Sequence, residues 1–171
     1  MNCVTWFEAF AFCTWDGGFL PTETEWNFAA AGGSAQRAYP WSAPADTLTA
    51  SCANANYDVN GLPTGYCAAD SGSAAAMKRV GAESPAGDGA WGHADLGGNA
   101  WEWTLDWFAA YAASCDDCAN LQTGTYRVIR GGNFAHSQSF MRTASRQFAD
   151  SDALPANRSL NVGFRCARPA S

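Results

Sequence analysis

Two short segments near the start of the chain carry the apolar periodicity of helices. The segment WFEAFAFCTW places apolar residues three and four positions apart, and Thr5 and Glu8 have the spacing of a capping box in front of it. Thr22 and Glu25 form a second capping box before the apolar segment EWNFAAA. A Gly-Gly pair follows each segment and is typical of a helix end. The pattern therefore predicts two helices within the first 33 residues.

The last third of the chain has the alternating pattern of strands. Residues 126–130, YRVIR, alternate and are rich in β-branched side chains, and a Gly-Gly pair follows them. Residues 139–146, SFMRTASR, alternate more weakly, and residues 161–168, NVGFRCAR, read as a last short strand. Helices first and strands last predict an α+β fold with short antiparallel strands, in which no βαβ unit occurs.

Residues 34–90 show almost no periodicity. They are rich in Ala, Gly, Ser, Pro and Asn, a composition that is also found in disordered segments. Tyr39, Trp41, Tyr57 and Tyr66 argue instead for an irregular but packed region. Long loops are uncommon in compact domains, so we expect this one to be fixed by a disulfide, a metal or a hydrogen-bonded network.

Length and charge limit the function classes. The 171 residues suit one domain, 1–171, and the net charge of −6 argues against nucleic-acid binding. No apolar run approaches the roughly 20 residues that span a membrane, and the first residues lack the pattern of a signal peptide. We therefore expect no membrane span, and a protein or small molecule as the ligand.

Seven cysteines favour an oxidising, extracytoplasmic location. Cys52 and Cys67 bracket the irregular region and suit a disulfide. Cys115 and Cys118 form a CxxC motif, which could be a redox pair, half of a zinc site or a local disulfide. The two acids between them raise a thiol pKa, which favours the disulfide. The odd count leaves one cysteine over, and Cys3 is the candidate.

The segment DLGGNAWEWTLDW, residues 95–107, is either a core strand behind an unusual turn or a functional site. Trp101 and Trp103 flank Glu102, and a buried carboxylate must be paired, hydrogen-bonded or metal-bound. The carbonyls of a Gly-Gly-Asn turn together with one carboxylate suit Ca²⁺ better than Zn²⁺. The alternative is that Glu102 accepts backbone N–H bonds or pairs with one of the arginines clustered in the last third of the chain. That cluster could also mark an anion site, although structural pairing suits arginine better.

Four blocks of this sequence resemble, in order, the signatures of the formylglycine-generating enzyme or sulfatase-modifying factor family. They contain LPTETEW, GNAWEW, RGG and GFR, and together they span nearly the whole chain. The resemblance implies an irregular, loop-rich α+β domain of C-type-lectin type.

The resemblance also implies bonds and ligands that the residues alone do not. It pairs Cys13 with Cys166 in a disulfide. It assigns a structural Ca²⁺ site to Asp95, Gly98, Ala100 and Glu102, and part of a second site to Asn56 and Tyr57.

This chain departs from the family pattern at the catalytic position. Formylglycine-generating enzymes have two cysteines shortly after RGG that hold copper, whereas the stretch GGNFAHSQSFMRTASR has none, with His136 near the place of the first. Soft copper requires thiolate ligands. We therefore expect no copper and assign no catalytic residue. The resemblance also implies a further portion before the first block, which family members usually have and which we expect to be missing here.

The resulting hypothesis is a non-catalytic binding module, which could be a retroelement-diversified variable protein. Its binding surface lies between RGG at 130–132 and GFR at 163–165, where aromatic and small polar side chains mix. The candidate ligand-binding residues are Asn133, Phe134, His136, Gln138, Phe140, Arg142, Arg146, Phe148 and Asn161. The structural alternative is that Phe134 and Phe140 belong to the core and do not contact a ligand. The functional alternative is a formylglycine-generating oxidoreductase or another metal-dependent enzyme of the same family.

Overall fold

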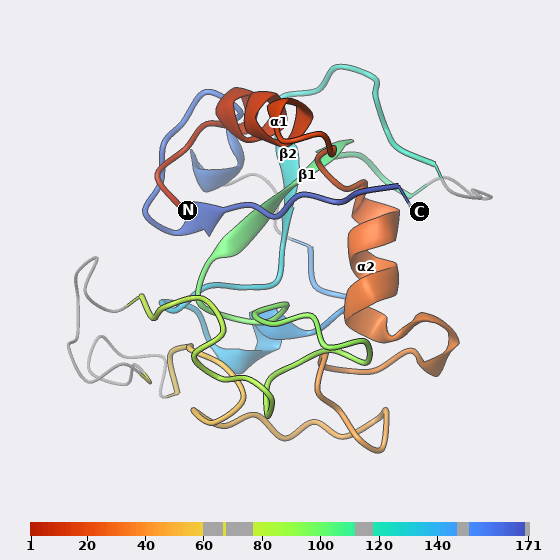
Figure 1. The fold of residues 1–171 in the computed structure, drawn as a ribbon, viewed down its shortest axis with the longest axis vertical. Coiled ribbons are helices and arrows are strands. Elements are labelled where there is room, and N and C mark those ends of the chain that lie inside the picture. Colours follow the sequence, from red (N-terminus) through yellow and green to blue (C-terminus); the bar gives the residue numbers. More distant parts are fainter. Residues whose placement is uncertain (60–66, 68–76, 112–117, 147–150, 170–171) are drawn as a thin grey trace.

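A computed structural model describes residues 1–59, 67, 77–111, 118–146 and 151–169. Two helices, three strands and short 3₁₀ turns are joined by long irregular segments (Figure 1). Helix α1 (Trp6–Trp15) and helix α2 (Glu23–Ala31) begin at the two predicted capping boxes, where Thr5 and Thr22 exchange hydrogen bonds with Glu8 and Glu25. Both helix predictions are confirmed, and no described helix is long and apolar enough to cross a membrane.

The sheet has the strand order β2-β1-β3. Strand β1 (Trp101–Trp107) lies in the middle and pairs antiparallel with β2 (Arg127–Arg130). The expected short antiparallel strands are found in β1 and β2, while strand β3 (Val162–Gly163) is only two residues long and pairs parallel with β1. Parallel pairing is possible because a long connection, residues 108–161 with β2 among them, separates β1 from β3.

The prediction of a strand over SFMRTASR is wrong. A 3₁₀ helix, η3 (Gln138–Met141), occupies its first half, and two further short 3₁₀ helices, η1 (Gly33–Ala35) and η4 (Ser151–Ala153), lie elsewhere. Met141 is fully buried and packs with Tyr39 and Tyr57, so a tertiary contact decides the conformation here and the weak alternation does not.

The main core lies between α1 and the sheet. Trp6, Ala9 and Cys13 of α1 pack with Trp101 and Trp103 of β1. Phe10, on the predicted apolar face, is instead exposed and stacks on Trp6. A single short helix, α1, therefore covers this side of the sheet, and the core lies between the two.

The irregular region forms a second layer on the opposite side of the molecule from α1 (Figure 1). Tyr39 and Tyr57 are buried in it, and the Cys52–Cys67 disulfide closes part of the segment. The prediction of a packed irregular region is confirmed where the structure describes it, while Tyr66 lies outside the described residues.

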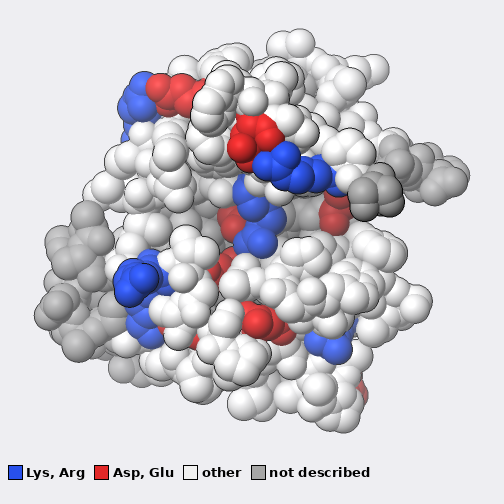
Figure 2. Space-filling view, in the orientation of Figure 1, with Lys and Arg blue, Asp and Glu red and all other residues white. Residues whose placement is uncertain are grey.

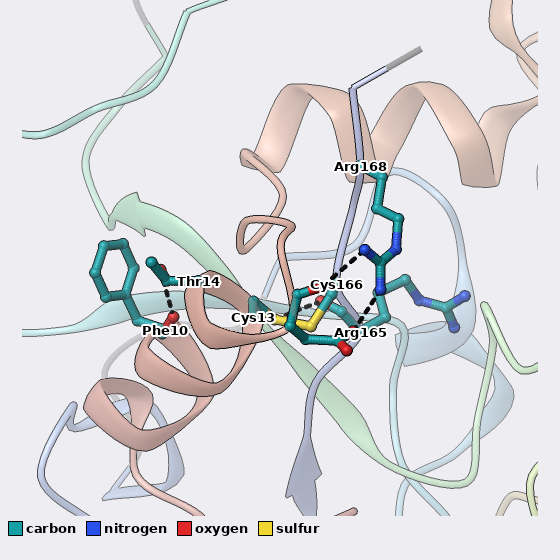
Figure 3. The surroundings of a disulfide bond; sticks show 7 residues. Phe10, Cys13, Thr14, Arg165, Cys166 and Arg168 are labelled. Carbon is teal, nitrogen blue, oxygen red and sulfur yellow. Dashed lines mark hydrogen bonds and ion pairs between the residues drawn. A yellow bond between two sulfur atoms is a disulfide. The ribbon is translucent and has the colours of Figure 1, made fainter. Parts of the chain in front are cut away.

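A disulfide joins Cys13 of α1 to Cys166, as the family resemblance implies (Figure 3). A backbone bridge between Phe19 and Ala167 runs alongside it, and a bridge between Asn2 and Gly163 places the first residues next to β3. The last described segment is therefore fixed to the first helix and to the start of the chain.

Candidate functional site

The turn before β1 requires its two glycines. A Cβ on Gly98 would lie 2.5 Å from the carbonyl oxygen of Asn56, and one on Gly97 would lie 2.8 Å from the Trp41 ring. Asp95 and Asn99 adopt positive φ angles of 56° and 64°, which non-glycine residues rarely do. The two glycines of GGN are therefore needed because this turn packs closely against the irregular region.

Asn99 is the centre of this turn, a role that the sequence analysis did not identify. Its side chain accepts the N–H of Lys78 at 3.0 Å and an amide N–H of Asn56 at 3.2 Å, and it donates to the Lys78 carbonyl at 3.2 Å. Its backbone N–H donates to the Asn56 carbonyl at 2.7 Å. Asn99 therefore fastens two stretches of the irregular region to the start of β1.

Glu102 is buried and forms a two-point ion pair with Arg165. Nε and Nη2 of Arg165 each lie 2.6 Å from a Glu102 oxygen, and the indole N–H of Trp26 donates to the same carboxylate at 2.7 Å. Nη2 also donates to the carbonyls of Ala94 and Asp95, both at 3.1 Å. The alternative in which Glu102 pairs with an arginine is the one that the structure shows.

The four residues predicted to hold Ca²⁺ line one pocket of about 390 Å³, together with Arg165. The oxygens that Arg165 contacts are a carboxylate and two carbonyls, the donor type that Ca²⁺ prefers. Of the four predicted ligands, Asp95 and Glu102 therefore offer oxygens that fit a cation, and in the structure the Arg165 guanidinium supplies that charge. No cluster of three His, Cys, Asp or Glu side chains that could hold a metal occurs in the described ranges, so an ion here would depend on backbone carbonyls.

Asn56 and Tyr57, the residues of the second predicted Ca²⁺ site, are both buried next to this turn. The Tyr57 carbonyl accepts the N–H of Cys67, and its hydroxyl donates to the Ala50 carbonyl at 3.2 Å. The second site stays a prediction.

A second carboxylate, Glu23 of α2, lies between two arginines. Arg146 grips both of its oxygens at 2.5 and 2.6 Å, and Nε of Arg130 lies 3.5 Å away. The Arg146 guanidinium also lies 3.9 Å from the centre of the Tyr111 ring. Arg130 is fully buried, and burial lowers its pKa although the charge of Glu23 opposes this. Arg130 also bonds Asn27, Thr143 and Ser145.

The predicted ligand-binding residues divide into buried and exposed positions. Asn133 and Phe134 are buried, and Gln138 and Arg142 are exposed. His136, Phe140, Arg146 and Asn161 are partly buried, and Phe148 lies outside the described residues. The alternative in which these phenylalanines belong to the core is therefore confirmed for Phe134, which is buried, and largely for Phe140, which packs against the main core. What the structure leaves accessible is a narrower surface around η3.

His136 faces inward and is held by its neighbours. Its Nδ1 lies 2.7 Å from Oδ1 of Asn133, and its ring lies 4.7 Å from the Phe140 ring and 5.7 Å from Trp101. The position where the resemblance places the first copper thiol is thus filled by a packed imidazole.

Most of the described cysteines are disulfide-bonded. Cys118 is disulfide-bonded, while its predicted partner Cys115 lies outside the described residues. Cys3 is the only free cysteine in the described part of the chain, and it is partly buried. No pair of free thiols is therefore present among the described residues.

A family profile described as the sulfatase-modifying factor enzyme 1-like domain matches residues 1–170. The chain belongs to this family. The formylglycine-generating enzyme of Streptomyces coelicolor is 39% identical over 98% of this chain and 52% of its own length. The inactive Cα-formylglycine-generating enzyme 2 of Bos taurus is 34% identical over 98% of this chain and 49% of its own. This sulfatase-modifying factor domain thus spans about half the length of these curated relatives.

Solved structures share the fold of the sulfatase-modifying factor domain. PvdO from Pseudomonas aeruginosa superposes with a TM-score of 0.73 at 25% identity, covering 99% of this chain and 61% of that one. Variable protein 1 of Treponema denticola gives a TM-score of 0.71 at 23% identity, covering 99% and 71%. These structures support the loop-rich α+β fold.

Proposed function

We propose that this domain is a non-catalytic binding module built on the formylglycine-generating enzyme scaffold. The observation that carries the proposal is the complete absence of cysteine between Gly131 and Arg165. Copper chemistry of the family type needs two thiolates in this stretch, because soft copper is bound by sulfur. A relative named formylglycine-generating enzyme and one named inactive Cα-formylglycine-generating enzyme 2 match this chain at 39% and 34% identity, so relatedness alone does not supply the activity.

The binding surface that we propose is the exposed side of η3 and the residues after it. Buried and exposed positions alternate here: Met141 and Thr143 are buried, while Arg142 and Ala144 face outward. The buried positions fix the backbone, and Gln138 and Arg142 are free to vary without loss of packing. Rigid support under adaptable polar side chains is typical of protein recognition surfaces.

The catalytic alternative is tested with a sulfatase peptide that contains the substrate cysteine. The domain is incubated with Cu(I), oxygen and the peptide, and the peptide mass is followed. We expect no conversion to formylglycine. Conversion at a rate above that of copper alone would overturn the non-catalytic proposal.

The binding surface is tested with a displayed random-peptide library selected on the wild-type domain. Enriched peptides should lose binding to a variant with Gln138→Ala and Arg142→Ala. They should keep binding to a control with Gln122→Ala and Arg168→Ala, which removes the same two residue types from exposed positions elsewhere. Peptides that bind all three proteins equally would place recognition on another surface.

We also propose that Ca²⁺ exchanges with Arg165 at the Glu102 turn, with Asp95, Gly98, Ala100 and Glu102 as ligands. The shared pocket and the oxygen atoms around Nη2 of Arg165 support it. Saturating Ca²⁺ at 100 times its Kd should stabilise the domain by about 2.7 kcal/mol relative to chelator. Glu102→Gln should remove this shift in melting temperature, and identical wild-type melting in Ca²⁺ and chelator would count against the site.

The disulfides support an extracytoplasmic location for the domain, because such bonds persist in oxidising compartments. Fractionation of cells that express the full-length natural protein tests this, with the thiol state of Cys13 and Cys166 as the readout.

A further inference from the structure

The pocket beside Glu102 has properties that neither the binding surface nor a Ca²⁺ site uses. Residues from four stretches line it: 1–2, 77–80, 94–102 and 163–165. Its volume of about 390 Å³ lies within the range of small-molecule sites, roughly 300–1,000 Å³. Figure 2 shows basic and acidic side chains beside a hollow on the face that it draws.

Basic residues are concentrated around this pocket. The chain has ten Lys and Arg residues and a net charge of −6, yet Lys78, Arg79 and Arg165 all line this one pocket. Lys78 is the only lysine of the chain. The lining also contains two acidic residues, Asp95 and Glu102, so the charge that the pocket offers a ligand depends on which of the three cations are already paired.

Among the described residues, one of these three cations has no acidic partner. Lys78 pairs with Glu83 at 2.7 Å, and Arg165 is matched by Glu102. Arg79 is exposed, and within the described part of the chain no acidic side chain pairs with it. An unpaired guanidinium at a pocket mouth is a ready donor to an incoming anion, because its fork matches carboxylate and phosphate oxygens.

Asp95, the other acidic residue of the lining, does not neutralise Arg79. Its carboxylate accepts the backbone N–H of Gly81 at 2.6 Å. Among the described residues no ion pair joins Asp95 to Arg79, so the Arg79 guanidinium remains available to an incoming anion.

The rest of the lining is suited to an apolar group. Met77, Val80 and Phe164 contribute aliphatic and aromatic surface between the charged residues. A bare inorganic anion would leave this surface unused, whereas a neutral apolar molecule would leave Arg79 unused.

We propose that this pocket binds a small organic anion, whose carboxylate or phosphate group meets Arg79 and whose apolar part lies against Met77, Val80 and Phe164. The site is separate from the exposed side of η3, so it does not depend on the proposed binding surface. It also does not require Ca²⁺, because Arg165 already balances Glu102.

Titration calorimetry in chelator-containing buffer at low ionic strength tests this with three probes: phenyl phosphate, inorganic phosphate and benzyl alcohol. Phenyl phosphate carries both features, and each of the others carries one. We expect one phenyl phosphate per chain, bound at least fivefold more tightly than either other probe. Absence of saturable binding, or equal binding of inorganic phosphate, would overturn the proposal.

Two variants locate the binding. Arg79→Gln should weaken phenyl phosphate binding about fivefold to tenfold, because it removes one charge-assisted contact. The charge-matched control is Arg168→Gln, which lies outside the pocket in an exposed pair with Asp16 and should change binding less than twofold. Equal weakening by both variants would mean that only net charge matters and would contradict the site.

A second pair of variants does not alter any described ion pair. Val80 is 80% exposed at the pocket and Val59 is 49% exposed outside it, so neither substitution disturbs a packed core. Val80→Glu places a negative charge at the mouth and should abolish binding, while Val59→Glu should retain it. Retained binding in Val80→Glu would overturn the proposal.

Discussion

Two Glu–Arg pairs with almost the same geometry have different surroundings in this domain. Glu102 and Arg165 meet at a pocket, and Glu23 and Arg146 meet at the start of α2. Trp26 links the two: its N–H donates to Glu102, and its ring lies 5.0 Å from the guanidinium of Arg130, the second partner of Glu23.

The two pairs differ in how deeply the arginine is buried that would lose its countercharge if the carboxylate were neutralised. Glu23 balances a fully buried Arg130 as well as Arg146, and Arg146 in turn holds the Ala109 carbonyl and the Tyr111 ring. Arg165 borders a pocket and keeps a quarter of its side chain exposed, so it can reach water. We therefore expect the Glu23–Arg146 pair to persist in the folded state, whereas our Ca²⁺ proposal requires the Glu102–Arg165 pair to exchange.

The largest expected effect comes from Glu23→Gln. It leaves Arg130 buried without a countercharge, and breaking a buried pair in this way costs about 3–5 kcal/mol. Urea denaturation measures the loss. Glu25→Gln, on the same helix, should cost less than about 1 kcal/mol because glutamine also completes a capping box. Similar losses in both variants would remove the distinction we draw for Glu23.

Glu102→Gln in chelator should have an intermediate effect of about 2 kcal/mol, because Arg165 can turn to solvent and glutamine can still accept from Trp26. A double-mutant cycle with Arg165→Met isolates the pair. We expect the double variant to be more stable than the sum of the single losses predicts. Strict additivity would show that the two side chains do not interact energetically.

The smallest effect is expected at an exposed pair, Glu8 and Arg158. The backbone N–H of Thr5 holds the pKa of Glu8 below its ordinary value; partial desolvation opposes this, and Arg158 lowers the pKa further. A lowered pKa in the folded state stabilises above the unfolded value and is lost as pH falls through the folded value. Glu8→Gln should therefore be slightly less stable than wild type at neutral pH and equal to it in acid. A difference that persists in acid would assign the effect to something other than the charge.

Local signals in the sequence located the helices but not the partners of the buried charges. Thr5 and Thr22 mark the helix starts because a capping box involves residues only three apart. Glu102 and Arg165 are 63 positions apart, and no local rule selects Arg165 among the arginines of the last third. The sequence could state that Glu102 needs a partner and could not state which one.

The region after β2 shows a second limit. The alternation through Phe140 and Arg142 resembles a strand, but Met141 is drawn into the cluster with Tyr39 and Tyr57 and the chain turns into η3. At Asn99 the local prediction was correct but incomplete. The sequence GGN predicted an unusual turn, but it did not predict that the Asn99 side chain would hydrogen-bond Lys78 and Asn56. In both cases the decisive contacts come from the irregular region. That region has no hydrophobic periodicity, so the sequence pattern does not predict its contacts.

The bond between Cys13 and Cys166 has a consequence for the order of events during synthesis. Domains generally fold as units while the chain emerges from its N-terminus, but the first helix here cannot be locked until a cysteine 153 positions later is available. Until then Cys13 can pair with Cys3, which precedes it, or with Cys52 and Cys67, which emerge next, so mispairing is a kinetic hazard. We therefore expect a disulfide isomerase to raise the yield of the correctly paired domain.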